Sequence, residues 1–146
     1  MIKIKELFDK PFPSQIIKKD QYDFESYFKI KKIGYLFHSS KHGSGKDSYW
    51  DISFSSHYKK SDDPDEIPGE DTITGEGNAY FVFSTVAGIL GQFIKIYHPN
   101  KFEFQAREPS RQKLYKVFSD LISRKFGYKV TVKIGKNNQN FYWFEK

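Results

Sequence analysis

The feature that most constrains the fold is an apolar segment, Ala79–Ile94, which follows two glycines placed one residue apart, Gly75 and Gly77. Its apolar residues recur at spacings of three and four, the period of one buried helix face. These residues are Ala79, Val82, Phe83, Val86, Ile89, Leu90 and Phe93. The other face is small or polar, so that a neighbouring element can approach closely, and consists of Ser84, Thr85, Gly88, Gly91 and Gln92. A helix that begins after Gly77 and stops before Pro99 is therefore predicted.

Segments of alternating apolar and polar residues surround this helix and predict a sheet. The predicted strands are Phe28–His38, Tyr49–Ser55, a short Thr72–Thr74, Lys101–Ala106, Tyr128–Ile134 and Phe141–Phe144, with a hairpin loop at Ser39–Lys46. The first strand is expected to contain a bulge or bend, because its alternation slips between Ile30 and Ile33. A second helix is predicted to start at Glu108–Ser110 and to end at Gly127, since proline suits a first turn and glycine suits a helix end.

The predicted order is β-β-(β)-α-β-α-β-β within a single domain, 1–146. This order predicts an α+β fold, a mostly antiparallel mixed sheet with two principal helices. Residues 1–23 are expected to be irregular, because Pro11 and Pro13 break any helix there. Residues 57–71 carry six carboxylates and almost nothing apolar, which predicts an acidic surface loop.

The composition indicates which cellular environment and which kinds of site the chain is suited to. There is no cysteine among the 146 residues, which excludes disulfides and thiolate metal sites and favours a reducing, intracellular environment. The first ten residues are charged throughout and lack the apolar core of a signal peptide. The chain contains no run of about 20 apolar residues, so no membrane span is predicted.

The net charge of +6 is concentrated in the last third of the chain. Residues 101–146 carry 11 Lys/Arg and 4 Asp/Glu, a balance of +7, whereas residues 1–100 carry 13 and 14, a balance of −1. This asymmetry is compatible with weak, salt-sensitive nucleic-acid binding aided by exposed aromatic residues such as Tyr142. A solvated lysine-rich face explains the same charges equally well.

Several motifs of known chemistry are absent. His42–Lys46 resembles a phosphate loop, but Ser40 and Asp47 stand where that motif needs a glycine and a Ser/Thr. No metal is expected, because the four histidines lack the spacing of a zinc site and the acidic loop fits no calcium-loop pattern. The four are His38, His42, His57 and His98.

Two helix starts are candidates for an anion site. Gly75, Gly77, Asn78 and Ala79 open the first helix, where free backbone N–H groups and the helix dipole can hold a pyrophosphate. A tight strand-to-helix turn explains the same glycines. Arg107 and Arg111 flank the start of the second helix, and Tyr115 follows in its first turns, where it can also simply pack.

These segments resemble small proteins of tailed bacteriophages at four places: Gly75–Ala79, Val82–Val86, Phe102–Ala106 and Glu108–Tyr115. The resemblance covers about residues 72–128 and implies no known activity. It does imply a phage accessory protein that works in the host cytoplasm or in the virion. Its expected partners are then a host protein or another phage protein.

A looser resemblance is to the GNAT acyltransferase superfamily, in which a Gly-rich loop opens a helix after a strand. It implies that Gly75, Gly77 and Ala79 line the pyrophosphate of acetyl-CoA or another acyl-CoA. It also implies that Tyr115 corresponds to the tyrosine that protonates the departing thiolate. Thr72 stands where the family usually has Gln or Arg. The leading hypothesis is thus an acyl-CoA-binding phage protein, and its alternatives are a non-catalytic virion or host-interaction protein and a weak nucleic-acid binder.

Overall fold

The computed structural model describes residues 13–30, 33–57, 78–106, 112–135 and 140–146. Within them the chain forms one seven-stranded sheet and two long helices. The elements are β1 (Ser14–Lys19), β2 (Asp23–Ile30), β3 (Ile33–His42), the short 3-10 helix η1 (Gly45–Asp47), β4 (Tyr49–His57), α2 (Asn78–Tyr97), β5 (Lys101–Ala106), α3 (Gln112–Phe126), β6 (Lys129–Ile134) and β7 (Asn140–Glu145). The predicted α+β fold class, with two principal helices, is confirmed.

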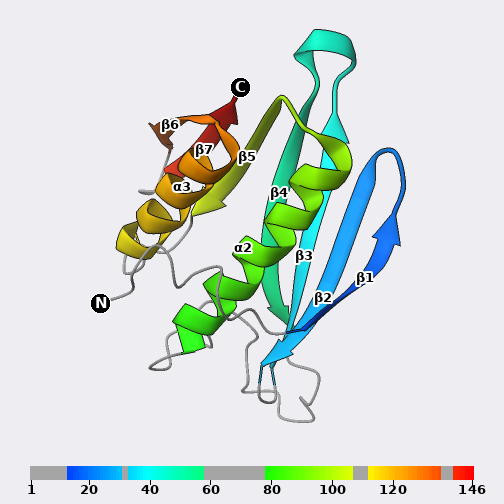
Figure 1. Ribbon diagram of the computed structural model, residues 1–146, viewed down its shortest axis with the longest axis vertical. Helices are drawn as coiled ribbons and strands as arrows, with labels where there is room; N and C mark the ends of the chain where they lie inside the picture. Colours follow the sequence, from blue (N-terminus) through cyan, green and yellow to red (C-terminus); the bar gives the residue numbers. More distant parts are fainter. Residues whose placement is uncertain (1–12, 31–32, 58–77, 107–111, 136–139) are drawn as a thin grey trace.

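The strands lie in the order β1-β2-β3-β4-β5-β7-β6 (Figure 1). All neighbours are antiparallel except β4 and β5, which run parallel and are joined through α2. A parallel pair needs such a crossover, because the chain must return to the same end of the sheet before the second strand begins. The predicted mixed, mostly antiparallel sheet is therefore confirmed.

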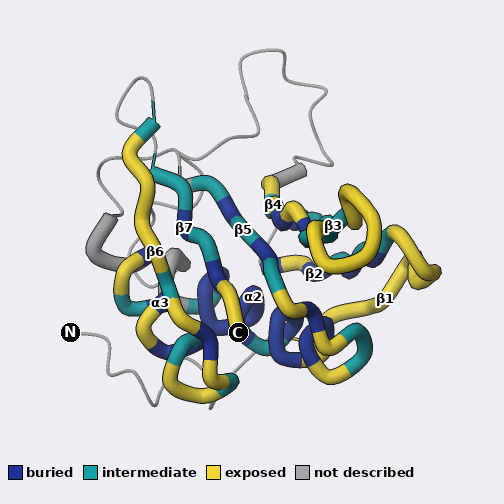
Figure 2. The backbone as a smooth tube through the Cα atoms, turned by 90° about the horizontal axis from the view of Figure 1, so that it is seen from above, coloured by how far each residue is buried: buried dark blue, intermediate teal, exposed yellow. Residues whose placement is uncertain are grey.

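Both helices pack on the same face of the sheet, and the core lies between the two layers (Figure 2). The strands present alternate side chains to this face, as their period of two requires. The buried strand residues are Phe24, Phe28, Ile30, Tyr35, Phe37, Trp50, Ile52, Phe102, Phe104, Tyr142 and Phe144. Their helix partners are Val82, Phe83, Val86, Ala87, Ile89, Leu90, Phe93, Ile94, Tyr115, Phe118, Leu121 and Ile122.

The small face of α2 approaches α3 at Gly91, in line with the predicted close approach of a neighbouring element. Ser84, Thr85 and Gly91 are buried, and the Thr85 hydroxyl donates to the Phe81 carbonyl oxygen at 2.8 Å. A Cβ placed on Gly91 would lie 3.4 Å from Cζ of Phe126 in α3, which is ordinary van der Waals contact. The close approach of the two helices therefore leaves room for a methyl group and for little more.

Two glycines of these helices are expected to respond oppositely to alanine. Gly91→Ala should raise the free energy of unfolding by up to about 1 kcal/mol, because a mid-helix glycine costs conformational entropy and the methyl group fits. Gly127 ends α3 with φ +77°, so Gly127→Ala should lower the same free energy by about 1 kcal/mol or more. Urea titrations of the two variants and the wild type measure both changes in the free energy of unfolding. A destabilised Gly91→Ala would show that the interface between the helices has no room for the methyl group.

The N-terminal part of the chain differs from prediction in two ways. Phe28–His38 is not one bent strand, because β2 and β3 form an antiparallel hairpin in which Ile30 pairs with Ile33. Residues directly opposite in a hairpin point to the same face, which explains the slip in alternation. The expectation that 1–23 is irregular is wrong for Ser14–Lys19, which forms β1. This strand is exposed along its length, and its register shifts between Ile16 and Lys18, so it shows no clear period.

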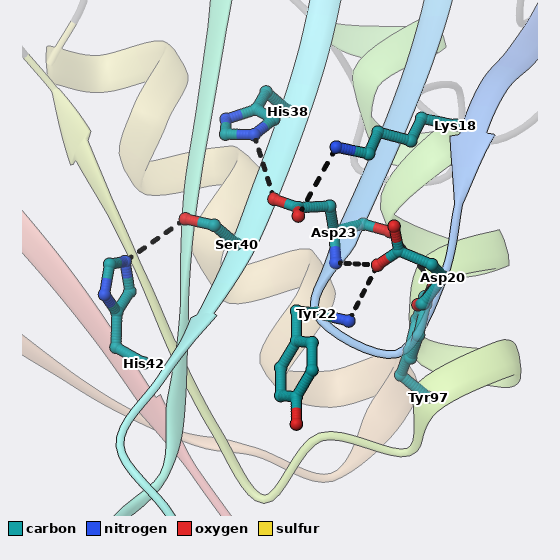
Figure 3. A network of polar contacts seen from close by, with 8 residues as sticks. All are labelled: Lys18, Asp20, Tyr22, Asp23, His38, Ser40, His42 and Tyr97. Carbon is teal, nitrogen blue, oxygen red and sulfur yellow. Dashed lines mark hydrogen bonds and ion pairs between the residues drawn. The ribbon is translucent and has the colours of Figure 1, made fainter.

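Polar contacts tie the turn between β1 and β2 to the end of α2 (Figure 3). The Asp20 carboxylate accepts from the backbone N–H groups of Tyr22 and Asp23, and these bonds lower the pKa of Asp20. The Tyr97 hydroxyl of α2 donates to the Asp20 carbonyl oxygen at 2.6 Å. The Asp23 carboxylate lies 3.5 Å from Lys18 Nζ and 3.6 Å from His38 Nε2. These contacts hold the β1–β2 turn against α2 and give His38 a carboxylate partner.

Unfolding should become easier in alkali, because burial raises the pKa of Tyr128 to about 12. Its hydroxyl donates to the Pro99 carbonyl oxygen. A raised pKa means that the folded state holds the proton more tightly, so stability is fully present below about pH 10 and is lost as pH rises to about 12. Urea titrations between pH 9 and pH 12 should show a shallower loss for Tyr128→Phe than for the wild type. Tyr22→Phe is the control, because Tyr22 is exposed. Equal slopes of the free energy of unfolding against pH for all three proteins would contradict the raised pKa of Tyr128.

Candidate functional site

The parallel strands β4 and β5 separate before they end. Their ladder joins three residue pairs, Trp50–Phe102, Asp51–Glu103 and Ile52–Phe104. Beyond them β4 stays paired with β3 as far as His57, and β5 stays paired with β7 as far as Ala106. Among the described residues, the facing edges of β4 beyond Ile52 and of β5 beyond Phe104 therefore have no strand between them. We call this region the β4–β5 split.

A pocket of about 250 Å³ lies at the split. Its lining consists of Asp51, Ile52, Ser53 and Phe54 of β4, Phe104 and Gln105 of β5, and Tyr115 of α3. Three of these, Ile52, Phe54 and Phe104, belong to the helix-covered side of the sheet, whereas Asp51, Ser53 and Gln105 belong to the opposite side. The pocket is thus lined from both faces, with an apolar inner wall and a polar outer rim, a common composition for small-molecule sites.

Tyr115 is the predicted catalytic residue, and the structure brings it to this pocket. Its side chain is 4% exposed and its ring packs edge-on against Phe83 at 5.0 Å between centroids. Phe104 and Tyr142 lie 6.0 and 6.2 Å from the same ring. Tyr115 is therefore part of the aromatic core and also contributes to the pocket wall, while its catalytic role stays a prediction.

Both helices begin at the end of the sheet where the split lies (Figure 1). Each follows a strand of the parallel pair and runs back against it, so that its N-terminus lies near the strand's C-terminal end. Asn78 and Ala79 are the first residues of α2. Gly75, Gly77, Arg107 and Arg111 lie outside the described residues, so their part in an anion site stays a prediction. The short strand Thr72–Thr74 and the acidic loop beyond His57 also lie outside them.

Two carboxylates that the sequence analysis did not single out lie beside the pocket on the open face of the sheet. Asp51 and Glu103 are opposite each other in the parallel ladder. Burial raises the pKa of Glu103, the charge of Asp51 raises it further, and Lys133 and His42 lower it. Alternation alone could have assigned both residues to the polar side of their strands. Their pairing depends on the register between β4 and β5, which no local pattern reveals.

A row of rings crosses the same face. The His42 ring stacks on Tyr49 at 5.4 Å, Tyr49 lies 5.6 Å from Trp143, and Lys133 Nζ lies 5.6 Å from the Trp143 ring centre. The expectation that Tyr142 is an exposed aromatic is wrong, because it is 3% exposed and faces the helices. The register of β7 turns Trp143 to the open face instead. No group of three acidic or histidine side chains in the described part of the chain is placed to hold a metal ion.

Comparisons with known proteins give a partial likeness to solved structures. Neither a scan against protein-family models nor a search of the curated proteins finds a match. Among the solved structures that are similar is an acetyltransferase of the GNAT family from Bacillus anthracis, with a TM-score of 0.36 and 11% sequence identity over 77% of this chain. The match spans 64% of that protein's length. A likeness at this level carries no functional argument, and the resemblance to phage proteins stays a prediction.

No helix in the described part of the chain is both long and apolar enough to cross a membrane.

Proposed function

We propose that the chain binds an acyl-CoA in the β4–β5 split. The observation that carries this proposal is the pocket at the point where a parallel pair loses its ladder, with Tyr115 in its wall. Backbone N–H and C=O groups at such an edge need partners. The pantetheine arm of coenzyme A is an extended chain with two amide groups, so it can supply those partners as an added strand does.

On the basis of the sequence motifs, we assign the pyrophosphate end of the acyl-CoA to the N-terminal ends of the two helices. A pyrophosphate matches the free N–H groups and the dipole of a helix N-terminus, which supports the assignment of Gly75, Gly77, Asn78 and Ala79. Along the sequence, Arg107 directly follows β5 and Arg111 directly precedes α3. Their guanidinium groups can add paired hydrogen bonds to phosphate oxygens.

If the bound thioester reacts, the expected chemistry is acyl transfer to an amine. The amine nitrogen attacks the thioester carbon, the C–S bond breaks, and Tyr115 donates its proton to the departing thiolate. We assign the acceptance of the amine's proton to Asp51, because it is the carboxylate among the residues that line the pocket. The alternative is a non-catalytic virion or host-interaction protein on the same fold, which would carry out none of these transfers.

The biological setting is proposed from the sequence resemblance alone. The motifs at Gly75–Ala79 and Glu108–Tyr115 support a phage accessory protein that acts in the host cytoplasm or the virion, together with a host or phage protein. Nucleic-acid binding stays a weaker alternative. The lysines of the last third support it, whereas Glu103 and Glu145, which flank Trp143 on the open face, oppose a polyanion.

A thermal-shift titration tests the proposal. Acetyl-CoA at millimolar concentration should raise the Tm of the wild type by several degrees, because a ligand that binds only the folded state stabilises it. Gly77→Ala should remove the shift if the backbone must approach a pyrophosphate closely. Tyr115→Phe should keep the shift and slow any acyl transfer. Absence of a shift with acetyl-, propionyl- and longer acyl-CoA would reject acyl-CoA binding.

A further inference from the structure

Strand β6 forms one edge of the sheet and is regular along its whole length. It lies last in the strand order and pairs with β7 through six consecutive residue pairs, Lys129–Glu145 to Ile134–Asn140. Among the described residues, no strand pairs with its other side. Such an edge presents a row of backbone N–H and C=O groups that another chain can pair with.

The opposite edge is built differently. Strand β1 shifts register between Ile16 and Lys18, and a bulge of this kind interrupts the ladder and turns an edge strand away from new partners. Lys18 is also engaged with Asp23 at 3.5 Å. The fold therefore protects one edge of the sheet and leaves the other regular.

The helix-facing side of β6 carries apolar side chains that α3 does not cover. Val130 packs against the core, but Val132 is 50% exposed and Ile134 is 80% exposed. Exposure therefore increases along the strand toward Ile134. Together, Val132 and Ile134 form an uncovered apolar patch beside an open backbone edge.

The open-face side of β6 is basic. Lys129, Thr131 and Lys133 are exposed there, and β6 contains no acidic residue. A second copy of the chain paired antiparallel about Thr131 would place each Lys129 opposite the partner's Lys133. Like charges directly opposite each other destabilise a sheet, so this central register disfavours a second copy as the occupant.

We propose that the β6 edge binds an extended segment of another protein, which adds a strand to the sheet. The segment has acidic residues at alternate positions, facing Lys129 and Lys133, and apolar residues between them, facing Val132 and Ile134. Backbone hydrogen bonds supply affinity and the alternating side chains supply selection. This interaction surface is separate from the β4–β5 split and does not depend on acyl-CoA binding.

Two labelled peptides test the proposal on the full chain by fluorescence anisotropy: Val-Glu-Val-Thr-Val-Glu, whose two Glu have the four-residue spacing of Lys133 and Lys129, and the same sequence with Lys in place of both Glu. The acidic peptide should bind about tenfold or more tightly than the basic one, because two cross-strand pairs change from attraction to repulsion. Exchanging Lys129 and Lys133 for Glu should reverse this preference. Ile134→Asn should weaken both peptides, and Ile17→Asn, on the other edge at a position 54% exposed, should leave binding unchanged.

Hydrogen exchange of the β6 amides locates the bound strand. Slowed exchange in β6 with the acidic peptide, and not in β1, supports the proposal. Three outcomes would overturn it: no binding of the acidic peptide, equal binding of both peptides, or concentration-dependent protection of β6 in the protein alone. The last outcome would identify a second copy of this chain as the occupant.

Discussion

Ser53→Phe is expected to abolish the rise in Tm that we predict for acetyl-CoA. Ser53 lines the pocket on its outer rim, where a phenyl ring would occupy the space between β4 and β5. The substitution should leave the fold intact, because the side chain is exposed and phenylalanine is well suited to a strand. The measurement is the Tm of the wild type and of the variant with and without millimolar acetyl-CoA.

Ser55→Phe is the matched control. Ser55 is the next residue on the same side of β4, it is also exposed, and it is not part of the pocket lining. It should keep the full ligand-induced shift. If both variants keep the shift, acetyl-CoA binds elsewhere, and the pocket at the split is not its site. If both lose it, the open face of β4 as a whole contributes to binding, and the split is not singled out.

Phe93→Ala is expected to cause the largest loss of stability. Phe93 is fully buried at the centre of the interface between α2 and the sheet. Its ring lies within 6.5 Å, between centroids, of the rings of Phe24, Phe37, Trp50, Tyr97 and Phe102. Removing a buried phenyl ring costs roughly 3–5 kcal/mol, because transfer energy is lost and a cavity is left. That is a large share of the stability of a typical folded domain, which is about 5–15 kcal/mol.

Equilibrium urea unfolding, followed by Trp fluorescence, measures this loss. Gln92→Ala is the control, because Gln92 is the neighbouring residue of α2 and is exposed. Its effect should stay within about 0.5 kcal/mol. A loss below about 2 kcal/mol for Phe93→Ala would show that the surrounding rings collapse into the space, which the close packing of a protein core normally prevents.

The candidate site was only partly accessible to prediction. Tyr115 was selected because the resemblance to the GNAT superfamily implies a role for it, whereas its position in the helix alone was equally compatible with packing. Asp51, Ser53 and Gln105 could not, because a polar residue on the open side of a strand has no distinguishing local pattern. What makes them neighbours of Tyr115 is the loss of the β4–β5 ladder after three pairs. The anion-site residues Gly75, Gly77, Arg107 and Arg111 stay predictions.

The sequence by itself determined the elements whose period is local and strong. The spacing of apolar residues predicted the buried face of α2, and alternation predicted β5 with the bounds Lys101–Ala106 that the structure shows. Gly127 marked the end of α3, where φ is positive. These patterns are readable because each residue's environment repeats along one element, through three or four residues in a helix and two in a strand.

Only the tertiary structure decided which strands are neighbours and in what register. The chain reverses direction between Ile30 and Ile33, although alternation suggested one bent strand. Strand β1 forms because β2 offers it a partner, without any buried side of its own. The parallel pairing of β4 with β5 is set by the crossover through α2, and its early end creates the pocket. Strand pairing joins residues far apart in the chain, so its free energy depends on contacts that no short stretch of sequence contains.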